Sequence, residues 1–447
     1  MISRRSAVLA GALLTGGCAS GLSHIFRPFE AKSNFVRVNS QRFVLGGQTY
    51  RFAGTNVWYG AYLGAPTAYG NRDRLRKELD TLAANGMTNL RVLGASELSP
   101  LKNSLTTTFR AAAPPYNEDL LAGLDFLLAE MGKRDMKAVV YLNNFWEWSG
   151  GMVTYLYWTN GGHYIDLGDP AHPWPEFADF SAQFYSSPPA VALYLQYVGA
   201  LITRTNNFTG IAYRDDPAIM AWELANEPRV GGSKAFVLPH LPAFYAWIAR
   251  TAKFIKARDP NHLVTTGSEG LRGCLDMADV TEKAHAVPEI DYMTFHLWPL
   301  NWSWINLKDL PGTYEQAEVK GRDHVKQHIA IAQKINKPLV AEEFGFPRDN
   351  GYAAGSPTTL RDRFYGMMFA EVLGSARSGG PFAGTNFWTW GGSGRAQHED
   401  YRMHPGDTFF VGDPPQEPQG ANSVFDCDAT TLEIIRAHAG ALKTVAG

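Results

Sequence analysis

Two glutamates in this sequence follow runs of apolar residues, where a buried strand would end. Glu227 closes the run WELANE and is followed by Pro228, which fixes the direction in which the chain leaves. Glu343 lies in the run LVAEEFG. Two carboxyl groups that face one cleft can break a glycosidic bond, because one protonates the leaving oxygen while the other attacks the anomeric carbon or activates water. The pair therefore indicates acid–base chemistry on a sugar.

Both glutamates also have a purely structural interpretation. A glutamate before a proline is often a solvated loop acid, but the apolar run before Glu227 favours an acid that emerges from a core strand. The acid at 342 or 343 could instead belong to a structural ion pair with a cationic side chain. Successive side chains of a strand point to opposite faces, so we expect only one of these two to face the interior. The other would then need a partner on the outer face or at the rim.

Strand-like and helix-like segments alternate along almost the whole chain, which favours parallel strands joined by helical crossovers. Helices are expected in several of the connections, including 71–85, 118–133, 242–257 and 359–376. Eight strands are predicted, at 51–57, 88–93, 137–143, 218–225, 263–268, 291–297, 338–344 and 384–390. Eight such units in one run predict an α/β fold, a single closed (β/α)8 barrel.

Long irregular segments rich in Gly, Pro and Trp follow three of the predicted strands, at about 145–190, 228–240 and 391–425. Loops of this length inside a compact domain are usually functional, and barrel active sites lie at the carboxyl ends of the strands. Alternating residues at about 35–51 predict a short hairpin before the barrel. We therefore expect one catalytic domain over 35–447, with its site built by the long loops.

Residues 1–34 are predicted to be an export signal and a tether. Two arginines near the start precede a short apolar run and resemble a twin-arginine signal. The stretch 14–18 resembles a bacterial lipoprotein cleavage box, with Cys18 as the lipid-bearing residue. Ordinary cleavage near Ser20, which would discard Cys18, is the alternative. The expectation is an exported protein that is periplasmic, membrane-anchored or secreted.

Composition excludes several classes of protein. The formal net charge of −2 provides no basic footprint for nucleic acid. Three cysteines cannot form a disulfide framework, so Cys274 and Cys427 are expected to be free buried thiols, with a bond between them as the alternative. No Cys/His cluster has the spacing of a zinc site. We expect no metal, no cofactor and a monomer.

The motifs Asn226-Glu227-Pro228 and Glu343-Phe344-Gly345 resemble those of glycoside hydrolase family 5, whose members are retaining (β/α)8 enzymes. The resemblance implies that Glu227 is the general acid/base and Glu343 the nucleophile, while Glu342 is only a neighbour. Asn226 is a neutral donor that could hold a sugar hydroxyl. The two motifs end the fourth and seventh of eight predicted strands, and together they are far more specific than either one.

Further positions match the same family. Arg91, in NLRV, resembles the arginine that braces the nucleophile, and a guanidinium there should keep Glu343 ionised. His296 resembles the active-site histidine, and Trp388 the tryptophan beneath the sugar under attack. Core packing would be the alternative for either residue alone.

One position departs from the family pattern. Many members have a tyrosine two residues after the histidine, with its hydroxyl on the nucleophile, whereas Trp298 stands here. An indole has an N–H donor but no hydroxyl. Three interpretations stay open: Trp298 supports the nucleophile differently, it serves as a sugar platform, or a tyrosine such as Tyr292 or Tyr352 replaces the missing hydroxyl.

From about 35 to 440 the chain is similar to the mannanase branch of the family, through GTN at 54–56, NNFW at 143–146, WEL at 222–224, DPPQEPQG at 413–420 and SVFD at 423–426. This resemblance implies a mannan endo-1,4-β-mannosidase acting on mannan, glucomannan or galactomannan polysaccharide or oligosaccharide. A retaining mechanism predicts a carboxyl separation of about 5–5.5 Å.

Three alternatives to this function remain: an exo-β-mannosidase, a β-1,4-glucanase on the same barrel, and a non-catalytic carbohydrate-binding protein. Flat indole rings suit both sugars and cores, so core packing is the alternative for every candidate sugar platform. The candidate platforms are Trp58, Trp146, Trp298, Trp302 and Trp390.

Overall fold

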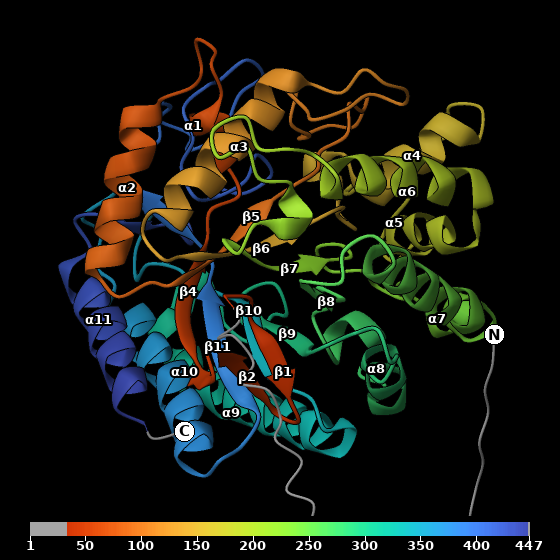
Figure 1. Ribbon diagram of the computed structural model, residues 1–447. Coiled ribbons are helices and arrows are strands. Elements are labelled where there is room, and N and C mark those ends of the chain that lie inside the picture. The colour runs from red at the N-terminus through yellow and green to blue at the C-terminus, as the bar shows by residue number, and fades with distance from the viewer. Residues whose placement is uncertain (1–33, 446–447) are drawn as a thin grey trace, which may run out of the picture.

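The computed structural model describes residues 34–445 (Figure 1). The predicted export signal, with Cys18, lies outside the described residues. Over 34–445, no helix combines the length and the apolar character needed to cross a membrane.

Eight parallel strands form the centre of the molecule, as predicted (Figure 1). Their hydrogen-bonded order is β8-β7-β6-β5-β4-β11-β10-β9. The two ends of this order meet where the backbone N–H of Asp291 donates to the carbonyl of Val264 over 2.8 Å, which closes the barrel. The strands are β4 (Phe52–Asn56), β5 (Asn89–Leu93), β6 (Lys137–Tyr141), β7 (Ile219–Glu223), β8 (Leu263–Thr265), β9 (Met293–Leu297), β10 (Leu339–Phe344) and β11 (Phe382–Phe387).

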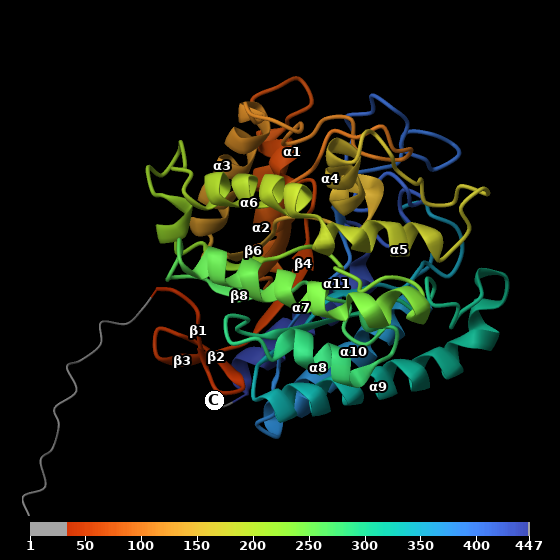
Figure 2. The same cartoon turned by 90° about the vertical axis from the view of Figure 1, so that its right-hand side faces the viewer.

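Helices cover the outside of the barrel (Figures 1 and 2). Asparagine caps begin two of them, because Asn71 accepts from the N–H of Arg74 and Asn117 from that of Leu120. The larger helices are α2 (Arg72–Ala84), α3 (Glu118–Gly132), α6 (Pro188–Ile202), α7 (Lys234–Lys256), α8 (Ala278–His285), α9 (Leu310–Ile335), α10 (Thr359–Arg377) and α11 (Ala429–Thr444).

Helix α7 begins earlier than predicted. Its first turns contain Pro239 and Pro242, which ordinarily argue against a helix. Ser233 caps the helix by accepting from the N–H of Phe236, and apolar side chains such as Val237 are buried on its inner face. Capping and packing therefore outweigh the local cost of the prolines.

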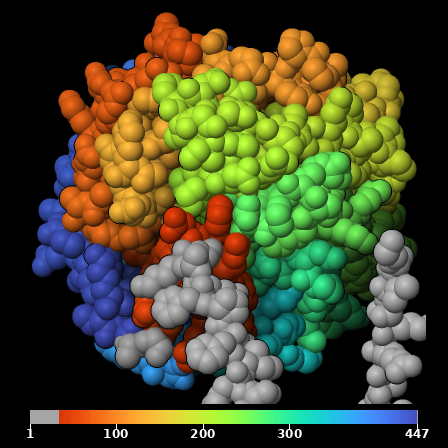
Figure 3. Space-filling model, viewed as in Figure 1, coloured from red at the N-terminus to blue at the C-terminus, as the bar shows by residue number. Residues whose placement is uncertain are grey.

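The predicted hairpin is a three-stranded antiparallel sheet of β1 (Arg37–Asn39), β2 (Arg42–Leu45) and β3 (Gln48–Tyr50). It closes the amino-terminal end of the barrel, opposite the long loops (Figure 2). In the space-filling view its red atoms lie between the blue C-terminal helix and green to teal segments (Figure 3). Phe43 is fully buried there and packs edge-on against Tyr292, with ring centroids 5.2 Å apart.

The long loops are partly helical. The segment predicted as irregular at 145–190 contains η1 (Glu147–Ser149), α4 (Gly151–Thr159), α5 (Glu176–Ser181) and η2 (Ala182–Ser186), while 391–425 is irregular apart from the short pair β12 (Trp390–Gly392) and β13 (Val424–Phe425). Gly150 and Gly151, both at positive φ, start α4 and hide it from a propensity-based prediction. Short elements η3 (Tyr213–Asp215), η4 (Arg272–Cys274), η5 (Leu307–Asp309) and α1 (Gly60–Gly64) complete the fold.

Both described cysteines are free thiols. Cys274 is buried, as predicted. Cys427 is exposed, so the prediction is wrong on that point: the residue lies in the short connection between β13 and α11, at the surface.

Candidate active site

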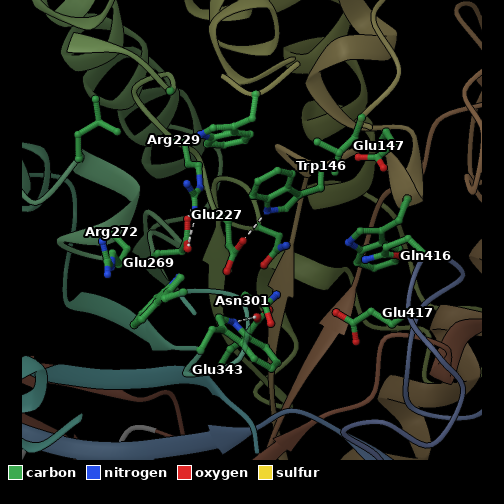
Figure 4. A pocket seen from close by; sticks show the side chains of 18 of the residues that line it. Trp146, Glu147, Glu227, Arg229, Glu269, Arg272, Asn301, Glu343, Gln416 and Glu417 are labelled. Carbon is green, nitrogen blue, oxygen red and sulfur yellow. Dashed lines mark hydrogen bonds and ion pairs between the residues drawn. The ribbon is translucent and has the colours of Figure 1, made fainter. Parts of the chain in front are cut away.

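A cleft of about 910 Å³ opens at the carboxyl ends of the barrel strands (Figure 4). Residues in or after six of the eight strands line it. These include Trp146 after β6, Glu227 after β7, Glu269 after β8, Trp298 and Trp302 after β9, Glu343 in β10, and Trp388 and Glu417 after β11. The segments predicted to build the site therefore do so.

Glu227 and Glu343 meet at the base of this cleft. Carboxylate oxygens of the two residues lie within 4.8 Å of each other, although the residues are 116 positions apart in the chain. Both side chains are nearly buried. This spacing agrees with the separation of about 5–5.5 Å found in retaining glycosidases and is shorter than the roughly 6.5–9.5 Å of inverting ones.

The backbone also aims Glu227 at the cleft. Its φ of +50° lies in the left-handed region, which residues other than glycine rarely adopt. The N–H of Glu227 donates to the carbonyl of Gly267 over 2.9 Å, and Pro228 follows. Strain of this kind persists only where neighbouring structure holds it, and it is concentrated at functional sites.

Arg91 in β5 contacts Glu343, the residue expected to be the nucleophile. Its Nη1 donates to Oε1 of Glu343 over 2.5 Å, and Nε and Nη2 donate to the two oxygens of Glu223 over 2.8 and 2.6 Å. Nη2 also donates to Oδ1 of Asn226 over 2.6 Å. Burial disfavours the guanidinium, but Glu223 and Glu343 outweigh it and raise the pKa of Arg91 well above its usual value.

Sequence reasoning missed the role of Glu223. Its signal was an acid inside the apolar strand β7, where a buried carboxylate needs a cationic partner. Arg91 is that partner, and both side chains are completely buried. The guanidinium is thus shared between Glu223, which is away from the cleft, and Glu343, which lines it.

The environment keeps Glu343 ionised. Burial alone would raise the pKa of its carboxyl, but the charges of His296 and Arg91 and their hydrogen bonds lower it below its usual value. Ionisation at neutral pH is what a nucleophile requires.

Glu342 and Glu343 both face the interior, so the expectation that only one of these adjacent acids does so is wrong. Oε2 of Glu342 lies 4.0 Å from Nε of Arg91, and its Oε1 accepts from the hydroxyl of Tyr292 over 3.0 Å. The pairing of β10 with β9 shifts between Ala341 and Glu343, so that Glu342 is an extra residue in the ladder. A bulge of this kind breaks the strict alternation of side chains.

His296, in β9, bridges the two catalytic candidates. Its Nδ1 lies 2.6 Å from Oε1 of Glu227 and 3.3 Å from Oε2 of Glu343. Burial disfavours the imidazolium, but the two carboxylates raise the pKa of His296 to about 10. The three residues group donor atoms closely enough for a metal ion. Nδ1 of His296 lies between the two carboxylates, so the three side chains form a hydrogen-bonded triad.

Two indole N–H groups complete the support of the carboxylates. Nε1 of Trp146 donates to Oε2 of Glu227, and Nε1 of Trp298 donates to Oε2 of Glu343 over 3.2 Å. Trp298 therefore contacts Glu343 directly. Tyr292 instead donates to Glu342, and Tyr352 packs against Tyr401, with ring centroids 5.6 Å apart.

Some of the remaining predicted site residues line the cleft, and others are packed in the core. Trp146, Trp298, Trp302, Trp388 and Asn226 line the cleft. Oδ1 of Asn226 accepts from Arg91, and its Nδ2 donates to Oδ1 of Asn144 over 3.0 Å, which leaves one N–H for a ligand. The packing interpretation holds for Trp58 and Trp390, which are 1% exposed and do not line the cleft. The indole N–H of Trp58 donates to the carbonyl of Gly412 over 2.6 Å and so holds the 391–425 loop.

An ion pair that sequence reasoning missed lies on one side of Glu227. Nη2 of Arg229 donates to Oε1 of Glu269 over 2.6 Å, and the guanidinium lies 5.0 Å from the ring centre of Trp146 (Figure 4). Burial is the largest cause that raises the pKa of Glu269 to about 7, and the nearby charge of Glu227 adds to it. A charged residue two positions after Glu227 was the available signal in the sequence.

A further carboxyl group borders the cleft on the side opposite Glu269 (Figure 4). Glu417, from the 391–425 loop, points into the cleft (Figure 4). Burial and the charge of Asp413 raise the pKa of Glu417 to about 8, although Asn422 donates to it over 3.2 Å. It lay within the DPPQEPQG motif but had no assigned role.

The barrel and its paired carboxylates define a glycoside hydrolase. Residues 33–446 match the family described as GH family 5 beta-mannosidase-like, and the chain belongs to glycoside hydrolase family 5. The family predicted from the two glutamate motifs is thereby confirmed.

Individual relatives agree with this assignment. "Putative mannan endo-1,4-beta-mannosidase 9" from Oryza sativa subsp. japonica is 30% identical over 403 residues, which cover 86% of each chain. "Mannan endo-1,4-beta-mannosidase 1" from the same organism is 32% identical and covers 79% of this chain and 78% of the relative. A mutant glycoside hydrolase family 5 mannosidase from Rhizomucor miehei, solved in complex with mannosyl-fructose, is 32% identical with a TM-score of 0.84, covering 92% of this chain and 98% of its own.

Proposed function

We propose that this protein hydrolyses β-1,4-mannosidic linkages of mannan, glucomannan or galactomannan with retention of configuration, as a mannan endo-1,4-β-mannosidase. The observation that carries the proposal is the approach of Glu227 and Glu343 to within 4.8 Å, with Glu343 held ionised by Arg91 and His296. The substrate class is supported by the relatives, whose names describe mannan hydrolysis.

In the first step, Glu343 attacks the anomeric carbon while Glu227 gives a proton to the leaving oxygen. Nδ1 of His296, held as imidazolium, lies 2.6 Å from Oε1 of Glu227, the residue that must donate a proton. In the second step, water attacks the same carbon and gives its proton to Glu227. Two displacements at one carbon restore the original configuration.

Replacement of each carboxylate tests these roles. We expect Glu343→Ala and Glu227→Ala each to abolish hydrolysis of mannan. In a separate measurement, NMR follows the anomeric configuration of the products that the wild type releases. Glu433→Ala, an exposed position in α11, is the control and should retain full activity. Full hydrolysis by Glu343→Ala would show that the nucleophile is another residue, and an inverted product would refute the retaining mechanism.

A second candidate function is exo-β-mannosidase action. The observation that favours it is that Gln416 and Glu417 of the 391–425 loop and Glu147 after β6 line the same side of the cleft (Figure 4). The Rhizomucor miehei relative is itself named a mannosidase. Product sizing on mannohexaose separates the modes: release of mannose alone means exo action, and a mixture of shorter oligosaccharides means endo action. A parallel panel with cellulose and xylan tests the glucanase alternative.

We further propose that the protein is an exported monomer, anchored to a membrane through Cys18. The support is the resemblance of residues 1–20 to export and lipoprotein signals. Fractionation of cells that express the wild type or Cys18→Ala tests this: the wild type should sediment with membranes and the variant should not. Light scattering of the purified protein measures its oligomeric state.

A further inference from the structure

Trp298 lies where two strand ends meet at the nucleophile. It directly follows β9, and Glu343 and Gly345 lie at the end of the neighbouring strand β10. The ring is 6% exposed and packs edge-on against Trp388, with ring centroids 6.3 Å apart. The indole is therefore fixed by packing while its N–H points at Oε2 of Glu343 over 3.2 Å.

The two oxygens of Glu343 have different surroundings. Oε1 accepts from Nη1 of Arg91, which is completely buried beneath the cleft. Oε2 accepts from Trp298 and lies 3.3 Å from Nδ1 of His296, which also contacts Glu227. Oε2 is thus the oxygen turned toward the acid/base and the cleft, where a sugar carbon would lie.

Gly345 makes room for the indole. A Cβ atom at this position would lie 3.0 Å from Cη2 of Trp298 and only 2.6 Å from Cζ3, and the latter distance is shorter than real Cβ contacts. Any larger residue at 345 would force the six-membered part of the indole to shift from its present position. The absence of a side chain at 345 therefore leaves the space that the indole occupies.

We propose that Trp298 is a positioning residue whose indole N–H orients Oε2 of Glu343 and stabilises it as a leaving group, an arrangement that requires Gly345. The inference rests on the proposed double-displacement function. When the glycosyl–enzyme ester is hydrolysed, the bond between the anomeric carbon and Oε2 breaks and the electron pair stays on Oε2. A new bond forms to the water oxygen, whose proton passes to Glu227. The N–H of Trp298 donates to the oxygen on which negative charge reappears.

The indole of Trp298 can support Glu343 only as a hydrogen-bond donor. An indole N–H donates one hydrogen bond and cannot accept one or ionise near neutral pH. The support that it gives is therefore the same across the working pH range. Loss of a hydrogen bond to a charged oxygen costs enough to slow the second step about 10- to 100-fold.

Burst kinetics with 2,4-dinitrophenyl β-mannoside test the proposal, because this leaving group makes the first step fast. We expect Trp298→Phe to release one equivalent of dinitrophenolate per enzyme in a burst, followed by turnover about 10- to 100-fold slower than that of the wild type. The acidic limb of its kcat/KM profile should move to higher pH, because one donor to the Glu343 carboxylate is lost. Trp298→Tyr should restore the rate through its hydroxyl. Gly345→Ala should resemble Trp298→Phe, although it removes no hydrogen-bonding group.

Trp247→Phe is the matched control. Trp247 is fully buried, and among the described residues its N–H has no hydrogen-bond partner. Thermal melting compares the folding of all variants with this control. If folded Trp298→Phe and Gly345→Ala both show wild-type turnover, no burst and an unmoved acidic limb, the proposal is wrong. Glu343→Ala distinguishes failure of the proposed function from failure of the role of Trp298. Full activity of Glu343→Ala refutes the proposed function. Loss of activity in Glu343→Ala together with wild-type turnover in Trp298→Phe refutes only the role of Trp298.

Discussion

Replacement of Arg91 by methionine should be among the most damaging single changes in the protein. The side chain is completely buried and donates hydrogen bonds to Glu223, Glu343 and Asn226, with a further one to Oδ1 of Asn56 over 3.0 Å. Methionine fills much of the volume but leaves two buried carboxylates without their cation. Breaking a buried ion pair from one side costs about 3–5 kcal/mol. Folded domains are stable by only about 5–15 kcal/mol, so a large share of the total would be lost.

Urea unfolding at pH 7 measures this loss. The control is Arg363→Ala, which removes an exposed pair with Glu315 and should cost about 1 kcal/mol or less. The pKa of Glu343 in the folded protein lies below its unfolded value, so its stabilisation is present above the unfolded pKa and is lost as the pH falls through the folded one. The difference between wild type and Arg91→Met should therefore be largest at pH 7 and shrink below about pH 4. A loss no larger than that of the control would refute the reasoning.

Three further predictions concern other parts of the molecule. The pKa of His296 is raised to about 10, so the stabilisation that its charge provides is complete below about pH 6.5 and is lost as the pH rises toward 10. Between pH 7 and 10, the free energy of unfolding in urea should therefore fall more steeply for the wild type than for His296→Gln. Parallel curves would contradict this. The pKa of Glu417 is raised to about 8, so Glu417→Gln should match the wild-type kcat/KM at pH 6 and differ above pH 8, whereas a large loss at pH 6 would disprove a neutral carboxyl there. Phe43→Ala should lower the free energy of unfolding by about 3–5 kcal/mol while kcat at 25 °C persists, because Phe43 closes the far end of the barrel; an unchanged urea midpoint would refute this role.

Much of the fold and the central pair of the site could be predicted from local patterns. A buried parallel strand appears as a short apolar run, and an acid at its end marks the carboxyl rim of the barrel. The eight predicted strands agree with those observed, most within two residues at each end. Glu227 and Glu343 were found because each lies directly in such a run, and the resemblance of their motifs to a family added roles that the pattern alone lacks.

The sequence by itself therefore determined the barrel, the rim that carries the site and the two glutamates. Only the tertiary structure decided how distant side chains share the interior: that a bulge in β10 turns Glu342 inward, that Arg91 is divided between Glu223 and Glu343, and that Trp298 reaches Glu343. The physical reason is that strand period and strand ends are local properties, whereas these contacts depend on the register between neighbouring strands. That register is set by packing around the whole barrel, and a shift of one residue changes which side chains meet.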